Sequence, residues 1–260
     1  MCLRSPEHKD EALRELNNRR EKVSNLAPIL WYSTGTIAIL LQELLSIYPY
    51  LSPPTLSQAL TDRICNVLGL YQCIALNSNT RPLFLQANLH LYLYPLINTS
   101  SKQRPFEQLR VTSLGVIGAL VKGEDPQAIE YLMNTELIVL CLRIMKRGNE
   151  LSRTVATFIV QKILLDNNGL EYVCQTGERL FAVAQILKDI IEDIHENGKD
   201  DQRLLRHIIK CFLRLSENDK ACASLVRFIP KCISTPGTSV ITDDQVKKWH
   251  VKLLKNLKLL

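Results

Sequence analysis

One stretch decides the fold: Leu164-Leu-Asp166-Asn-Asn-Gly-Leu-Glu-Tyr-Val173. A long apolar run of helical character ends in a polar turn rich in Asn, Asp or Gly, and a shorter half-apolar segment follows. The same order recurs in three other places. These are Ile74-Ala-Leu-Asn77-Ser-Asn-Thr-Arg-Pro-Leu-Phe-Leu85, Leu120-Val-Lys-Gly123-Glu-Asp-Pro-Gln-Ala-Ile-Glu-Tyr-Leu132 and Leu213-Arg-Leu-Ser216-Glu-Asn-Asp-Lys-Ala-Cys-Ala-Ser-Leu225.

The spacing of these turns indicates a repeat architecture. They begin at positions 77, 123, 166 and 216, so the steps are 46, 43 and 50 residues. Repeats of this length built from helices alone are typical of armadillo- and HEAT-type solenoids. We therefore predict an all-α fold in which stacked helical repeats form an armadillo-like right-handed superhelix, with residues 1–260 as a single domain. Such a fold offers a long surface to partners and usually has no catalytic pocket.

Helical periodicity extends over most of the chain. The segment 89–94 alternates weakly, as a strand would, but its neighbours are helical and no partner strand is visible, so we predict helix there too. The last helix is predicted to begin with a T-x-x-Q capping box at Thr242. The predicted helices cover residues 5–21, 25–47, 55–76, 106–121, 151–165, 178–194, 200–215 and 242–260.

Composition limits the class of protein. Hydrophobic residues make up 46% of the chain and charged residues 22%, with a net charge of +6, which is ordinary for a globular protein and compatible with acidic partners. None of the eight cysteines forms a C-x-x-C pair, so we interpret them as small core residues rather than a disulfide framework or a metal site. The charged N-terminus and the short apolar run 37–41 predict neither a signal peptide nor a membrane span. We expect a soluble protein of cytoplasm and nucleus.

No arrangement of residues indicates catalysis. The chain lacks the glycine-rich phosphate loops, the H-E-x-x-H zinc motif and the G-x-S-x-G nucleophile motif, and its five histidines are far apart. Glu192, Asp193 and Glu196 cluster on one helix, where a solvated face is the simpler interpretation and a carboxylate pair for acid-base work is the alternative. We predict that the chain is not an enzyme and needs no cofactor or metal.

Two features point toward binding instead. Gly115 and Gly118 lie within one predicted helix, where they serve either close helix packing or a smooth floor that a partner approaches. A basic stripe, defined by Arg203, Arg206, Lys210 and Arg214, has the spacing of one helix face. The stripe is either an ordinary solvated face or a ridge that contacts phosphates. Because no aromatic ladder flanks it in the sequence, any nucleic-acid binding should have weak sequence preference.

Longer segments resemble a known family. The stretch Arg110 to Lys122 and the stretch Thr154 to Asp166 are near-verbatim matches to the required-for-cell-differentiation (RCD) family, the armadillo-repeat subunit of the CCR-NOT deadenylase complex. The segments Leu26-Ala-Pro-Ile-Leu-Trp31, Pro53-Pro54-Thr55-Leu56 and Lys248-Trp249 also fit. The resemblance extends from about Ser5 to the end of the chain.

This resemblance implies a non-catalytic adaptor in mRNA decay and translational repression. It implies docking on the NOT scaffold subunit through Tyr32, Thr34 and Ala38, and a concave groove containing Gln108, Gly115 and Val155 that takes short motifs of RNA-binding and silencing proteins. It also implies a tryptophan-pocket region containing Gly177 and Arg179, nucleic-acid contact at Arg203, and homodimers in some members.

This chain departs from the family pattern at three of those positions. The family has Tyr where this chain has Gln108 and Gly177, and Phe where it has Thr34. Aromatic side chains are typical interface anchors, so these departures predict a changed set of partners. The alternative hypothesis is a nucleic-acid-binding regulator of transcription or differentiation that uses the basic stripe.

Overall fold

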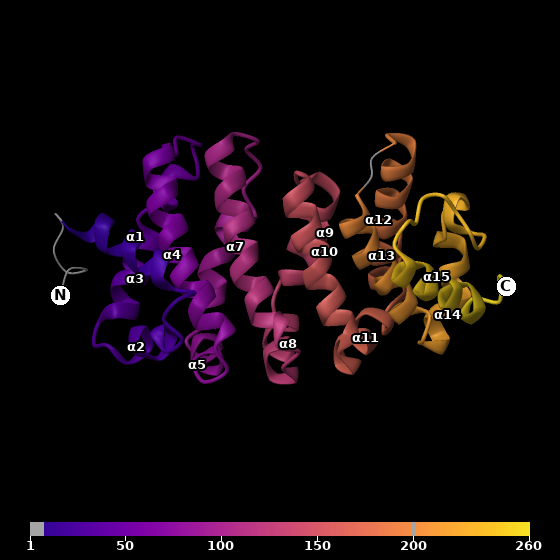
Figure 1. Ribbon diagram of the computed structural model, residues 1–260, viewed down its shortest axis with the longest axis horizontal. Helices are drawn as coiled ribbons and strands as arrows, with labels where there is room; N and C mark the ends of the chain where they lie inside the picture. Colours follow the sequence, from indigo (N-terminus) through magenta and orange to yellow (C-terminus); the bar gives the residue numbers. More distant parts are fainter. Residues whose placement is uncertain (1–7, 199–200) are drawn as a thin grey trace. The chain divides into compact units, whose positions relative to one another are not determined.

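The computed structural model describes residues 8–198 and 201–260, and every regular element in those ranges is a helix (Figure 1). The chain divides into two compact units, residues 1–131 and 132–260, and the division falls inside helix α8 (Pro126–Met133). The expectation of one domain stays a prediction. The start of the first helix predicted at residues 5–7 lies outside the described residues, and α1 begins at Lys9.

In the first unit, α4 (Gln58–Leu76) packs along α7 (Arg104–Lys122), and both helices are 19 residues long. Large apolar side chains fill the core, and Tyr71 meets Phe84 edge to face with ring centroids 5.4 Å apart. Glycine at position 69 leaves room for the side-chain ends of Asn17 and Arg20, which a Cβ there would displace. The other helices are α1 (Lys9–Arg19), α2 (Leu26–Tyr32), α3 (Thr36–Leu45), α5 (Arg81–Gln86), α6 (Tyr94–Ile97) and the 3-10 helices η2 (Tyr48–Tyr50) and η3 (Leu89–Leu93).

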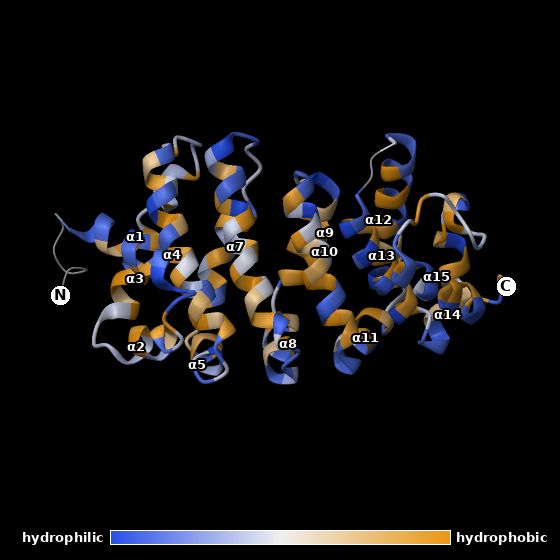
Figure 2. Ribbon diagram, in the orientation of Figure 1, coloured by the Kyte–Doolittle hydropathy of each residue, from blue (hydrophilic) through white to orange (hydrophobic). Residues whose placement is uncertain are grey.

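In the second unit, α10 (Glu150–Leu165) packs between α9 (Leu137–Arg147) and α13 (Gln202–Leu215), and α13 also packs against α15 (Asp244–Asn256). Phe212 of α13 is fully buried. Most helices carry both hydrophobic and hydrophilic residues, as amphipathic helices do (Figure 2). The remaining helices are α11 (Asn167–Cys174), α12 (Gly177–Glu196), α14 (Asp219–Leu225), η4 (Val226–Phe228) and η5 (Lys231–Ile233).

The repeated turns are built on one hydrogen-bonding device. The side-chain oxygens of Asn77, Asp166 and Asn218 each accept hydrogen bonds from the backbone N–H groups two and three residues further on, at 2.8–3.3 Å. Asp125 accepts one such bond at 3.1 Å. At Asp166 and Asn218 these contacts satisfy N–H groups that a starting helix leaves without intrahelical partners. The bonds to Asn77 instead hold the turn before α5, whose N-cap is Thr80 and has no side-chain cap bond. The polar turns predicted from the sequence thus directly precede the short helices α5, α8, α11 and α14.

Most of the predicted helices are confirmed, including the helical assignment of residues 89–94, which form η3 and the start of α6. The prediction of one helix over 25–47 was wrong. The backbone breaks between α2 and α3 at Gly35, whose φ of 80° lies in the left-handed region that glycine adopts readily.

The predicted capping box at Thr242 was also wrong. Asp243 is the N-cap of α15, and its carboxylate accepts from the backbone N–H of Gln245 at 2.8 Å and of Val246 at 3.0 Å. Aspartate is at least as good a cap as threonine, and its negative charge favours the helix N-terminus.

The seven described cysteines are all free thiols, and Cys141, Cys174 and Cys211 are buried. Burial raises the pKa of Cys141 to about 12, in keeping with its interpretation as a core residue. Cys2 lies outside the described residues. Within the described ranges, no group of three or more His, Cys, Asp or Glu side chains could hold a metal ion.

No single described helix has the length and apolarity to cross a membrane. One pair, Leu26–Tyr32 with Thr36–Tyr50, meets the length and composition requirement only when taken together, and it is bent by 89°.

The turn device yields a stability prediction. Replacing the cap in Asp166→Ala leaves two backbone N–H groups of α11 without their partner and should lower the free energy of unfolding by about 1 kcal/mol. Urea unfolding followed by far-UV circular dichroism measures the change. Asp166→Ser is the control and should recover most of the loss, because serine is also a good cap. Equal loss in both variants would contradict the capping role.

Candidate interaction surfaces

The first unit places two of the predicted groove residues on α7. Gln108 lies near the start of this helix, where its amide hydrogen-bonds side chains of α4. Gly115 lies two turns further on and is partly exposed. A Cβ built there would meet only the side-chain nitrogen of Gln72, at 3.7 Å, so the space above it is open. Gly118 is buried. The floor interpretation of Gly115 stays a prediction, and the burial of Gly118 agrees with close helix packing.

The third predicted groove residue, Val155, belongs to the second unit. It lies half-buried on α10, and Leu151, one turn earlier, is 49% exposed. Phe158 continues the same face one turn later and is also half-buried. This apolar face has the helical spacing that suits docking of an apolar peptide anchor.

The predicted tryptophan-pocket region lies at the start of α12. Gly177 is exposed, and a Cβ there would meet nothing within 4 Å. The Arg179 guanidinium stacks 4.0 Å from the centre of the Tyr172 ring and donates to the Tyr172 carbonyl at 3.1 Å. Arg179 is therefore held flat on its own unit.

Sequence reasoning missed the aromatic pair beside this region. Phe181 of α12 is 57% exposed and meets Phe228 of η4 edge to face, with ring centroids 5.4 Å apart. The sequence pattern could have indicated Phe181, because this large apolar residue lies on the otherwise polar face of an amphipathic helix whose apolar face begins at Leu180. Exposed aromatic pairs of this kind are frequent anchors at interfaces.

The predicted scaffold-binding residues surround the break between α2 and α3. Tyr32 is 70% exposed at the end of α2, Thr34 is exposed in the turn, and Ala38 is exposed on α3. Ile29, which the sequence analysis did not single out, is 49% exposed one turn before Tyr32. The three predicted residues thus lie exposed on either side of the α2–α3 turn, with Ile29 as an exposed aliphatic residue earlier on α2.

The basic stripe of α13 is only partly available to a ligand. Arg203 and Arg206 are exposed and Lys210 is half-exposed. Trp249 of α15 lies beside them, with the Arg206 guanidinium carbon 5.4 Å and the Lys210 ammonium nitrogen 5.1 Å from its ring. A single aromatic ring therefore flanks the stripe, from a helix distant in sequence; it is not an aromatic ladder, and the expected weak sequence preference stays a prediction.

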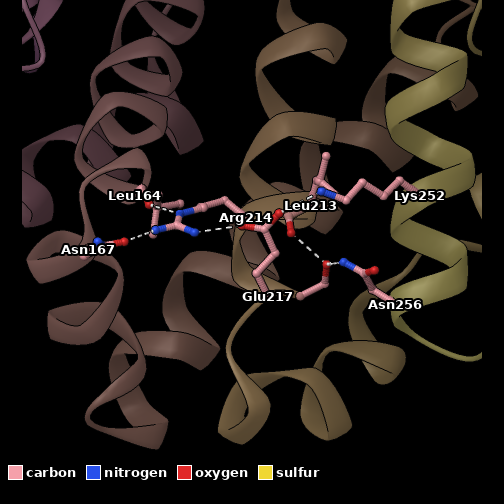
Figure 3. Close-up of polar contacts among 8 residues, drawn as sticks. Leu164, Asn167, Leu213, Arg214, Glu217, Lys252 and Asn256 are labelled. Carbon is pink, nitrogen blue, oxygen red and sulfur yellow. Dashed lines mark hydrogen bonds and ion pairs between the residues drawn. The ribbon is translucent and has the colours of Figure 1, made fainter.

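Arg214, the last member of the stripe, has a structural role (Figure 3). Its guanidinium donates to the Leu164 carbonyl at the end of α10 at 3.0 Å, to the Asn167 side chain, and to the Glu217 carboxylate at 2.7 Å. Lys252 of α15 donates to the other Glu217 oxygen at 3.1 Å. Arg214 therefore joins α10, α13 and α15 and is not free to bind phosphate.

Comparison with known proteins now identifies the family. Residues 1–257 match the model of the cell differentiation family, Rcd1-like. The chain belongs to the Rcd1-like cell differentiation family. It is 49% identical to "Cell differentiation protein rcd1" of Schizosaccharomyces pombe over 96% of this chain and 88% of that protein. It is also 49% identical to "Protein CAF40" of Saccharomyces cerevisiae over 91% of this chain and 63% of that protein.

Solved structures confirm the predicted fold class. A designed armadillo repeat protein matches with a TM-score of 0.71 at 15% identity, covering 98% of this chain and 96% of the design. A computationally designed armadillo repeat protein for modular peptide recognition also matches with a TM-score of 0.71 at 15% identity, covering 97% of this chain and 94% of that design. At this level of identity the likeness establishes only the fold. This member of the Rcd1-like family is an all-α, armadillo-type protein.

Two of the three carboxylates considered for acid-base work form ion pairs in this Rcd1-like chain. Asp193 pairs with Arg153 at 2.9 Å, and Glu192 pairs with Lys188 at 3.8 Å along α12. Glu196 is exposed near the end of that helix. The solvated-face interpretation accounts for all three.

A neutral histidine lies between the basic stripe and α10. The ring of His207 donates from Nδ1 to the Gln161 side-chain oxygen. It also packs edge to face against the Phe158 ring, with the ring centroids 5.6 Å apart. Burial, and then the positive charges of Arg203, Arg206 and Lys210, lower the pKa of His207 to about 4. The stripe therefore gains no charge from this histidine at neutral pH.

His207 should make stability depend on pH. Its folded-state pKa lies below the unfolded value of about 6.5, so between these values the unfolded chain binds more protons and the fold loses stability as pH falls. From about pH 7 to about pH 5, the urea midpoint of the wild type should fall more than that of His207→Gln. The exposed His195→Gln is the control and should follow the wild type. Parallel curves for wild type and His207→Gln would contradict the assignment.

Proposed function

We propose that this chain is a non-catalytic adaptor subunit of the CCR-NOT mRNA deadenylation complex, acting in mRNA decay and translational repression in cytoplasm and nucleus. The observation that carries the proposal is the whole-chain match to the Rcd1-like family. The armadillo-type fold supports it, because such repeats present extended surfaces to other polypeptides. The paired carboxylates on α12 give no support to an enzyme.

The proposed scaffold contact is the apolar end of the first unit formed by Ile29, Tyr32 and Ala38. These side chains are exposed, and Tyr32 combines a large apolar ring with a polar tip, as interface anchors commonly do. Thr34 adds a hydroxyl where an aromatic anchor would bury more area. In this proposal, Gly115 and Val155 receive short motifs of regulators, and the region of Gly177, Arg179 and Phe181 receives aromatic side chains of silencing proteins.

A Tyr32 variant tests the scaffold contact. With purified full-length chain and the helical docking fragment of the NOT scaffold subunit, Tyr32→Ala should weaken binding about 30-fold, the loss of roughly 2 kcal/mol expected for a central aromatic anchor. Calorimetric titration measures this affinity. Tyr131→Ala removes an exposed tyrosine elsewhere in the same unit and should leave binding unchanged. If the wild type does not bind the fragment at all, the adaptor proposal fails.

A second candidate function, single-stranded nucleic-acid binding, is favoured by the contact between Trp249 and the basic stripe. Arg206 and Lys210 lie over an indole ring that would stack on a base, while these cations and Arg203 would contact phosphates. The charge distribution agrees, since residues 132–260 contain 20 Lys and Arg against 15 Asp and Glu, whereas residues 1–131 contain 12 against 11.

Two kinds of variant separate the parts of this surface. For a fluorescent oligothymidylate, Arg203→Ala and Arg206→Ala should each reduce the slope of log affinity against log salt by about 0.7. Trp249→Phe should weaken binding while leaving that slope unchanged, because stacking releases no counterions. Lys220→Ala, at an exposed lysine of α14, is the control. Affinity that is absent, or that does not vary with salt, would rule out this function.

A further inference from the structure

Three polar side chains form an exposed cluster where α4 and α7 begin. The Gln58 side-chain nitrogen donates to Asp62 Oδ1 at 2.8 Å and to Gln108 Oε1 at 2.9 Å. The Gln108 side-chain nitrogen donates to the same Asp62 oxygen at 3.2 Å. We call Gln58, Asp62 and Gln108 the acceptor cluster.

Most of the donors in this cluster are already used within it, whereas some of its acceptors are free. An amide nitrogen carries two hydrogens, and both from Gln58 and one from Gln108 are used within the cluster. The groups without a described partner are two acceptors, Asp62 Oδ2 and the Gln58 side-chain oxygen, and one hydrogen of the Gln108 amide. The cluster therefore presents acceptors and one negative charge to solvent.

The charge of Asp62 is not neutralised by the described part of the chain. Its neighbour Arg63 is directed elsewhere, to Asp10 at 2.6 Å and to Glu43 at 3.6 Å. No basic side chain in residues 8–198 and 201–260 forms an ion pair with Asp62. The complement of such a cluster is a cationic donor, and the forked guanidinium of arginine matches a carboxylate best.

Gly115 provides a second contact point on the same surface. Residues 108 and 115 are two turns apart on one face of α7, so the acceptor cluster and the open glycine lie about 10 Å apart along the helix. The space above Gly115 is free of side chains apart from Gln72, which lets a polypeptide backbone approach closely. The two points are therefore within reach of one short peptide.

We propose that the α4–α7 surface selects a partner segment with an arginine or lysine that binds Asp62 within the acceptor cluster, while a small residue of the same segment lies over Gly115. This inference rests on the proposed adaptor function and specifies the chemistry of one class of regulator motif. Asp62 and Gln108 are the specificity-determining residues, because Gln108 orients the carboxylate through its amide and adds no apolar anchor.

Selection from a random peptide library tests this. Phage-displayed peptides are enriched on the immobilised full-length chain, and the enriched peptides are then titrated by fluorescence anisotropy. They should share one basic position, and Asp62→Asn should weaken binding roughly threefold to tenfold. Replacing the basic peptide residue by glutamine should cost the wild type the same factor and cost Asp62→Asn nothing, as a double-mutant cycle requires.

Asp189→Asn is the matched control. Asp189 also accepts from a glutamine four residues earlier, Gln185, at 2.6 Å on an exposed helix face, but it belongs to the other unit. It should bind the peptides as the wild type does. Gly115→Trp should abolish binding by filling the space above the helix, and circular dichroism should confirm that each variant is folded.

Each contrary result has a definite meaning. Peptides that are blocked by Gly115→Trp but lack a basic position, or that bind Asp62→Asn equally well, would overturn this inference while leaving the adaptor function intact. A selection that yields no peptide sensitive to Gly115→Trp would overturn it as well. The adaptor function is judged separately by the Tyr32-dependent binding of the scaffold fragment, which uses a different surface.

Discussion

The structure depends on a single kind of contact, an Asn or Asp side chain that accepts backbone N–H groups at the end of a long helix. At Asp166 and Asn218 this contact caps the short helix that follows, and at Asn77 it holds the turn between α4 and α5. The first N–H groups of a helix have no intrahelical partner, so one polar residue decides where the chain changes direction. The long helices are then free to pack side by side, as α4 does with α7 and α10 with α13.

The sequence predicts the helices where their apolar periodicity is long and where a polar turn of this kind follows. It fails where a backbone angle decides the outcome. Residues 25–47 are apolar on most sides, so their pattern predicts one helix that includes the short polar stretch 33–35. The backbone is instead extended at Ser33 and has a positive φ at Gly35, which separates α2 from α3. At Thr242 two adjacent residues can both act as caps, and the spacing to Gln245 favoured the wrong one.

The candidate surfaces are predictable to a lesser extent, because each depends on contacts between distant segments. The spacing of Arg203, Arg206 and Lys210 was sufficient to place them on one helix face. Nothing in the sequence places Trp249 beside them, since helix-to-helix contact brings it there. For Gln108, the family resemblance predicted that the position belongs to a binding surface. Only the structure shows that its amide donates a hydrogen bond to the Asp62 carboxylate.

The contacts of Arg214 show why cations at regular helical spacing need not all belong to one binding surface. The C-terminal end of a helix carries unsatisfied carbonyls and partial negative charge, which attract a nearby cation. At the end of α10, Arg214 donates to the backbone carbonyl of Leu164. At the end of α4, Arg81 donates to the backbone carbonyls of Ala75 and Leu76. Each unit therefore assigns one arginine to the end of a long helix. Cations earlier on α13 face no such carbonyls, so they alone are available to a ligand.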